Sequence, residues 1–123
     1  MSERAFINAD PQHPGWRSPL ARALANAPAG IRDVSAEADG ADIEALGPVA
    51  GVAGIEIDAP FAPRLLARMT DVDLDALPTI AAVSHIRARI EHDDDRFRIW
   101  FPQEYADYLA EVVLDAWEGL TDA

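Results

Sequence analysis

The strongest constraint on the fold is the alternation of apolar and polar residues between positions 80 and 101. Ile80–Glu91 and Arg96–Phe101 both repeat with a period of two, as a β-strand with one buried face does. The polar residues 92–95 between them are typical of a turn. The sequence therefore predicts an antiparallel hairpin. One face would carry Ala82, Ser84, Ile86, Ala88, Ile90, Phe97, Ile99 and Phe101, and the other His85, Arg87, Arg89, Arg96, Arg98 and Trp100.

A helical period follows the hairpin. From Pro102 onward, apolar residues recur at steps of three and four, which predicts an amphipathic helix with one core-facing stripe. We expect that stripe to contain Tyr105, Tyr108, Leu109, Val112, Val113, Ala116 and Leu120.

Weaker signals precede the hairpin. Val49–Ile57 is rich in β-branched residues and predicts a strand, and Pro60–Met69 predicts a helix. Ile31–Ala38 predicts a short strand, and Ser18 and Pro19 predict the start of a short helix. The expected fold class is α+β: a split βαβ, ferredoxin-like antiparallel sheet with helices packed on one face.

The expected domain organisation is simple. A chain of 123 residues has the length of one domain. Residues 1–17 lack any period and contain two prolines and a glycine, which predicts an extended N-terminal arm. Residues 18–123 would form the single α+β domain. Within it, the acidic, glycine-containing stretch Asp39–Gly47 predicts a loop.

Composition excludes several function classes. The absence of cysteine excludes disulfides, cysteine nucleophiles and cysteine-ligated zinc. A net charge of −12 disfavours binding to nucleic acid and to anionic membranes. No apolar run is long enough to span a bilayer, and the N-terminus does not resemble a signal peptide, so we expect a cytoplasmic protein. All basic residues are arginine, which indicates either a GC-rich genome or a salt-rich habitat.

Candidate catalytic and metal-binding groups are few. His13, His85 and His92 lack metal-site spacing, and no nucleophile accompanies them, so exposed strand or tail positions are expected. Asp71–Asp75 matches only the start of a calcium loop and is more typical of helix capping. Asp93–Asp95 is typical of a solvated turn. We therefore predict no catalytic residue and no metal site in this chain.

Aromatic and arginine residues mark a candidate interface. Tryptophan and arginine are enriched among the residues that dominate binding energy between proteins. The polar face of the predicted hairpin combines both types. Ordinary partial burial is the alternative interpretation of the tryptophans. The predicted partner-contacting residues are Trp16, Arg17, Arg87, Arg89, Arg98 and Trp100.

Several segments resemble a known family. These are residues 17–21, 61–70 (Phe-Ala-Pro-Arg-Leu-Leu-Ala-Arg-Met-Thr), 71–78 (Asp-Val-Asp-Leu-Asp-Ala-Leu-Pro), and 97–102 with 105–109. Over residues 52–118 the chain resembles the gamma subunit of heterotetrameric sarcosine oxidase, in the aminomethyltransferase-like, folate-binding domain family. The chain is shorter than typical gamma subunits, and Asp58-Ala59-Pro60-Phe61 replaces their usual Gly-Pro-x-Ala turn.

The resemblance implies a support role. It predicts a non-catalytic accessory subunit of a flavin-dependent amine oxidase or demethylase complex. Flavin, NAD and folate would then bind to larger flavoprotein subunits of the hetero-oligomer, and this chain would bind no cofactor. Two alternatives stay open: a stand-alone folate or one-carbon-binding domain, and a structural domain that self-associates through the hairpin face.

Overall fold

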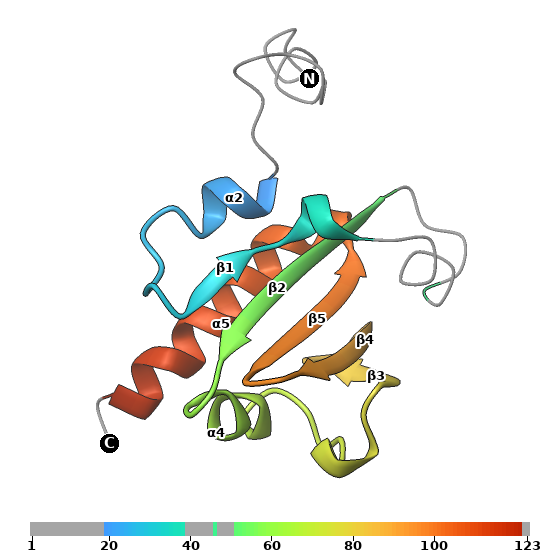
Figure 1. Cartoon of the computed structure of the whole chain (residues 1–123). Coiled ribbons are helices and arrows are strands. Elements are labelled where there is room, and N and C mark those ends of the chain that lie inside the picture. The colour runs from blue at the N-terminus through green and yellow to red at the C-terminus, as the bar shows by residue number, and fades with distance from the viewer. Residues whose placement is uncertain (1–18, 39–45, 47–50, 122–123) are drawn as a thin grey trace, which may run out of the picture.

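The computed structural model describes residues 19–38, 46 and 51–121 (Figure 1). The predicted arm at residues 1–17, the capping residue Ser18 and nearly all of the predicted loop Asp39–Gly47 lie outside these ranges. The α-helices are α2 (Pro19–Ala23), α4 (Ala62–Ala67) and α5 (Ala106–Thr121), and the 3-10 helices are η1 (Ser35–Glu37), η2 (Leu74–Ala76) and η3 (Gln103–Tyr105). The strands are β1 (Ile31–Asp33), β2 (Val52–Asp58), β3 (Thr79–Val83), β4 (Ile86–Asp93) and β5 (Arg96–Pro102).

The five strands form one antiparallel sheet in the order β1-β2-β5-β4-β3. β2 and β4 both pair antiparallel with β5, so they run parallel to each other and are separated by β5. The chain passes from β2 through α4 before it reaches β3 and β4 (Figure 1). This is the split βαβ arrangement, extended by β3 at one edge and by β1 at the other. The predicted α+β class is confirmed.

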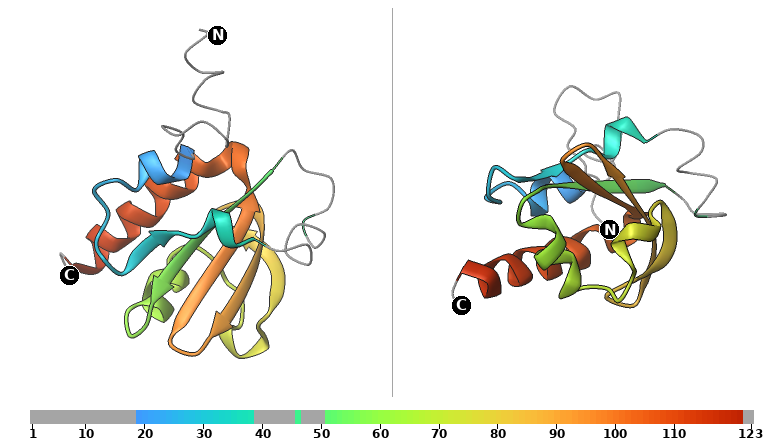
Figure 2. Two further views of the ribbon diagram at one scale, coloured as in Figure 1. Left: turned by 45° about the horizontal axis from the view of Figure 1, so that its top comes forward. Right: turned by 60° about the horizontal axis from the view of Figure 1, so that its bottom comes forward.

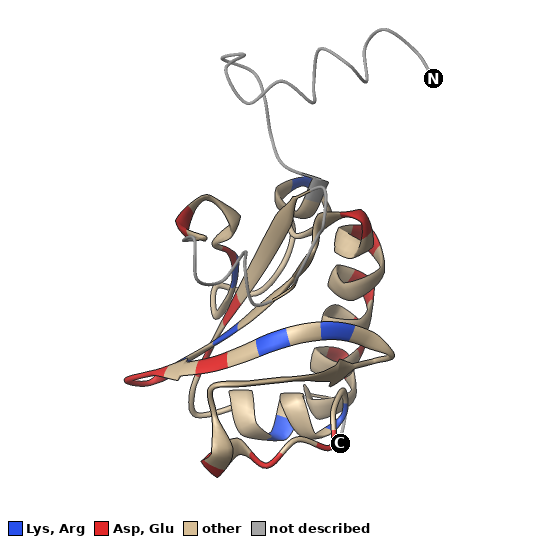
Figure 3. Ribbon diagram, turned by 90° about the vertical axis from the view of Figure 1, so that its right-hand side faces the viewer, with Lys and Arg blue, Asp and Glu red and all other residues tan. Residues whose placement is uncertain are grey.

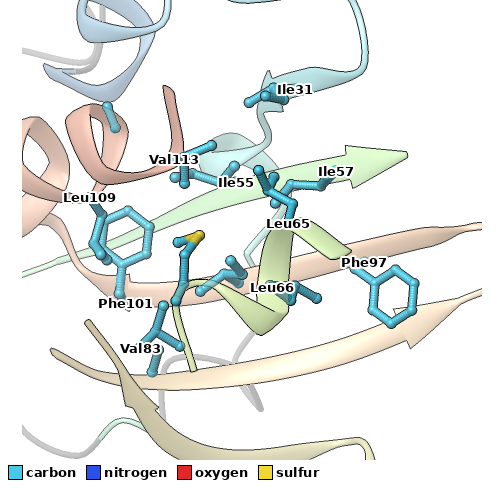
Figure 4. Packing of buried hydrophobic residues seen from close by; sticks show 14 of the residues in the cluster. Ile31, Ile55, Ile57, Leu65, Leu66, Val83, Phe97, Phe101, Leu109 and Val113 are labelled. Carbon is cyan, nitrogen blue, oxygen red and sulfur yellow. The ribbon is translucent and has the colours of Figure 1, made fainter. Parts of the chain in front are cut away.

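One face of the sheet carries the main core. Alternate residues of β2, β4 and β5 point to this face, where α2, α4 and α5 cover them. Figure 2 shows the helices gathered on this side of the sheet, and Figure 4 shows how their side chains meet those of the strands. The stripe predicted for α5 is confirmed at its centre, where Leu109 and Val113 are almost fully buried. The labelled core residues are Ile31, Ile55, Ile57, Leu65, Leu66, Val83, Phe97, Phe101, Leu109 and Val113.

A second, smaller apolar cluster lies on the opposite face, called the outer face here. It consists of Val34, Leu46 and Trp100, with Val52 packed against it. The Trp100 ring lies close against Gly54. A Cβ atom at Gly54 would come within 2.2 Å of Cζ3 of Trp100, so only glycine allows this approach.

The prediction of one continuous strand from Ile80 to Glu91 is wrong. The chain turns back at Ser84 and His85, whose φ angles are 48° and 75°. This two-residue turn joins β3 to β4 as a second hairpin, and it moves Ala82 to the outer face beside Arg87. Such turns usually contain asparagine or glycine, which tolerate positive φ at little cost, so serine and histidine did not indicate a turn here.

The predicted core stripe of the last helix begins too early, because its first two residues are exposed. Tyr105 and Tyr108 have exposed fractions of 38% and 43%. Tyr105 belongs to η3, which precedes the first turn of α5. The hydroxyl of Tyr108 donates a hydrogen bond to the carbonyl of Ser84, at 3.1 Å, so this residue braces the β3–β4 turn instead of filling the core.

Candidate functional site

The outer face of the sheet carries a row of alternating charges. The register places Arg32 of β1 opposite Glu56 of β2, then Glu56 opposite Arg98 of β5, and Arg98 opposite Glu91 of β4. Opposite charges on directly paired strands attract each other, so the row supports the pairing of four strands at once.

Glu56 is the centre of this row. Its exposed fraction is 2%, and it is the one buried charged residue in the described parts of the chain. Its Oε1 atom accepts bonds from Arg32 Nη2 at 2.6 Å and Nε at 3.1 Å. Its Oε2 atom accepts a bond from Arg98 Nε at 2.8 Å, and Arg96 Nη1 lies 3.8 Å from Oε1. Both oxygens of the carboxylate are therefore paired, as burial of a charge requires.

The electrostatics keep this carboxylate ionised. Burial by itself raises the pKa of Glu56, but the hydrogen bonds from Arg32 and Arg98 outweigh it and lower the pKa below its ordinary value. The hydrogen bond from Arg32 likewise lowers the pKa of Asp58. The hydrogen bond to Asp58, and to a smaller extent the one to Glu56, raises the pKa of Arg32. A carboxylate with a lowered pKa and two guanidinium partners is a poor general base near neutral pH, so a structural role fits it better.

Two of the predicted interface residues take part in contacts within the chain. Trp100 has no exposed area, and its Nε1 atom donates a hydrogen bond to Glu91 Oε1 at 3.0 Å. Trp100 therefore offers no surface to a partner in this conformation. The side chain of Arg98 is 20% exposed and pairs with Glu56 and, at 3.2 Å, with Glu37.

The other two described interface candidates lie at the open end of the outer face. Arg87 is exposed. Arg89 is partly exposed, and its Nη2 atom lies 3.7 Å from Glu91 Oε2. Across the β3–β4 pair, Ala82 is opposite Arg87 and Ile80 is opposite Arg89. We call these four residues the β3–β4 patch. Trp16 and Arg17, also predicted to contact a partner, lie outside the described residues.

The charges around this patch are unevenly distributed. Figure 3 shows both basic and acidic positions on the sheet, and further acidic positions along α5 and in the turns. Ile80 is one of the three large apolar or aromatic residues with substantial exposure in the described parts, at 38%. The patch thus joins arginines to an exposed isoleucine on a chain of net charge −12.

A separate hollow lies beside the β3–β4 turn. Its volume is about 400 Å³, and Asp71, His85 and Tyr108 are among the residues that line it. The hydroxyl of Thr70, also in the lining, donates to the carbonyl of Ala82 at 2.8 Å. The hydroxyls of Thr70 and Tyr108 are therefore both bonded to the main chain of this hairpin.

The remaining predicted motifs take structural roles. Asp73 caps η2 by accepting a hydrogen bond from the main-chain N–H of Asp75 at 2.9 Å, as the capping interpretation predicted. His92 stacks on Phe97, with ring centroids 4.1 Å apart. His13 lies outside the described residues. Within residues 19–38, 46 and 51–121, no three histidine or acidic side chains converge as metal ligands. None of the helices there combines the length and the apolar character needed to cross a bilayer.

The comparisons with known proteins identify no family. No family model matches the chain, and no curated protein matches it. The resemblance of residues 52–118 to the sarcosine oxidase gamma subunit therefore stays a prediction.

Sequence reasoning missed Glu56, the centre of the charge row. A signal was present, because Glu56 lies between Ile55 and Ile57 in the middle of an apolar strand. A carboxylate in such a position needs a cationic partner, and the arginines of the neighbouring strands were the candidates.

Proposed function

We propose that this chain is a non-catalytic accessory subunit of a sarcosine-oxidase-like, flavin-dependent amine oxidase or demethylase complex in the cytoplasm. The larger flavoprotein subunits would bind flavin, NAD and folate and would carry out the chemistry. The β3–β4 patch would be the surface of this chain that docks on them. The proposal starts from the resemblance of the segments between residues 52 and 118 to gamma subunits of that enzyme.

The observation that carries the docking role is the composition of the β3–β4 patch. Arg87 and Arg89 of β4 lie along one side of an apolar strip made by Ile80 and Ala82 of β3. Arginine is enriched at protein interfaces, and the buried centre of an interface is more apolar than the rest of the surface. The rest of the outer face is closed by the Glu56 ion pairs and by the cluster around Trp100, so the patch is its open part.

The hollow beside His85 supports the second candidate, a stand-alone folate or one-carbon-binding domain. Its volume of about 400 Å³ is within the range of small-molecule sites. Calorimetric titration of the isolated chain with tetrahydrofolate tests this function. Measurable heat that disappears in His85→Ala would favour it over the accessory role.

Co-expression with the neighbouring genes tests the accessory role. We expect the chain to elute in a complex with a subunit that shows flavin absorbance. The variant Arg87→Glu/Arg89→Glu should elute separately from that subunit. Arg22→Glu/Arg64→Glu is the matched control, because it changes the net charge equally at two exposed helical positions. Elution of the wild-type chain alone, or as a homodimer, would contradict the proposal.

A further inference from the structure

In the described part of the chain, β3 is an edge strand whose free side is covered only at its C-terminal end, where the main-chain N–H of Ser84 donates to the carbonyl of Met69 at 2.7 Å. Among the strands that the structure describes, β3 has a neighbour on one side only. Its five residues, Thr79–Val83, include no charge and no proline. Edge strands in soluble proteins usually carry charges, prolines or bulges, because an unpaired edge is a template for pairing with another chain. The opposite edge, β1, is only three residues long and contains Arg32 and Asp33.

The turn geometry shows which main-chain groups face outward. A two-residue turn makes Val83 and Ile86 a hydrogen-bonded pair, and in antiparallel strands bonded and non-bonded pairs alternate. The N–H and C=O groups of Ala82 and Ile80 therefore point away from β4. The hydrogen bond from the Thr70 hydroxyl to the Ala82 carbonyl agrees with this direction. Both groups of Ile80 and the N–H of Ala82 remain directed toward the edge.

The side chains beside this edge favour an acidic neighbour. Adjacent strands lie about 4.8 Å apart, so a strand added to β3 would lie roughly 10 Å from β4. Ala82 is small, which leaves room for the Arg87 side chain to cross β3 toward the added strand. Arg89, two residues further along β4, lies opposite Ile80. Acidic side chains on the outer face of an added strand would therefore meet two guanidinium groups, and an apolar one would meet Ile80.

We propose that the β3 edge takes an extended acidic segment of the partner subunit as a sixth strand of the sheet. This inference rests on the accessory function proposed above and specifies the chemistry of the partner. Main-chain bonds to both groups of Ile80 and to the N–H of Ala82 set the register. Arg87 and Arg89 select acidic side chains on the outer face, as cross-strand charge pairs do elsewhere.

A second copy of this chain fits the edge less well. Thr79–Val83 brings no acidic side chain to pair with Arg87 and Arg89. Each copy also has a net charge of −12, and two such chains repel each other.

Titration of the full-length, ¹⁵N-labelled chain with a blocked synthetic heptapeptide of alternating glutamate and valine tests the inference. We expect chemical-shift changes and slower amide exchange at Ile80 and Ala82. Arg87→Glu should weaken binding about tenfold, since it replaces a favourable charge pair with repulsion. Arg64→Glu, an equal change of charge on α4, should leave the affinity unchanged. Ile80→Pro should abolish binding, because proline removes an outward N–H and leaves the β3–β4 hydrogen bonds in place.

Three results would overturn the inference. These are the absence of shifts at Ile80 and Ala82, equal binding of a lysine–valine peptide, and concentration-dependent dimers that Ile80→Pro dissolves. Circular dichroism verifies the fold of Ile80→Pro, and Arg87→Glu tests the same surface without a backbone change. Different results would refute the sixth strand and the accessory role. If Ile80→Pro still elutes with the flavoprotein, the sixth strand is wrong and the accessory role stands. If the wild-type chain binds the peptide but elutes alone, the accessory role is wrong.

Discussion

Replacing Glu56 by glutamine tests the charge row most directly. Glutamine keeps the shape of the side chain but removes the charge to which Arg32 and Arg98 donate. Removing one partner of a fully buried ion pair costs about 3–5 kcal/mol. The Arg32 and Arg98 side chains are 37% and 20% exposed, so both can regain hydration, and the cost falls to about 2–3 kcal/mol. For a chain of this size we expect the melting temperature to fall by roughly 10 °C.

Urea unfolding followed by tryptophan fluorescence measures this loss. Glu111→Gln is the matched control, because Glu111 is exposed on α5 and the change should stay within about 0.5 kcal/mol. If the free energy of unfolding fell less in Glu56→Gln than in the control, the charge row would not hold the four strands together. The structural role assigned to Glu56 would then be wrong.

The pH dependence of the same pair of proteins gives an independent measurement. The pKa values of Glu56 and Asp58 are lower in the folded chain than their ordinary values of 4.5 and 3.8. The folded state thus binds fewer protons than the unfolded state, so these groups stabilise the fold above those values. Their contribution is lost as the pH falls through the folded-state pKa. We expect the stability gap between wild type and Glu56→Gln to be constant near neutral pH and to narrow below about pH 4.5.

Three further variants test the fold around the site. Ser84→Asn/His85→Gly should raise the free energy of unfolding by about 1 kcal/mol, and with it the urea midpoint, because asparagine and glycine adopt positive φ with less strain. A lower midpoint would show that His85 makes stabilising contacts. Gly54→Ala should cost about 1–3 kcal/mol and shift the fluorescence of Trp100 to the red, and unchanged emission would contradict the close ring contact. Leu109→Ala should cost about 2–5 kcal/mol by thermal denaturation, and a loss below 1 kcal/mol would contradict its burial.

The hairpin of β4 and β5 could be predicted because its information is local. Alternation within each strand fixes which residues face the core, and Phe97 and Ile99 are buried as that pattern requires. The turn at Ser84 and His85 could not be found in the same way. Neither residue is a usual choice for positive φ, so the strands on both sides appeared as one.

The environment of Trp100 was also beyond local reasoning. Its face of the hairpin was assigned correctly, but its burial depends on Val34 and Leu46, which come from other parts of the chain. Glu56 is a similar case, because its partners lie 24 and 42 residues away along the sequence. Alternation indicates which face of a strand a residue occupies, whereas only the tertiary structure shows what covers that face.

The two ends of the outer face differ in how their arginines are used. On β1, β2 and β5, Arg32 and Arg98 neutralise a buried carboxylate, and a partner that recruited either of them would leave Glu56 without a counter-charge. On β4, Arg87 is exposed, and the neighbouring strand is short, uncharged and paired on one side. Recruiting Arg87 costs the fold little. If the chain docks on a partner as proposed, the β3–β4 end is therefore the better place for the contact, because the arginines at the Glu56 end are already paired within the chain.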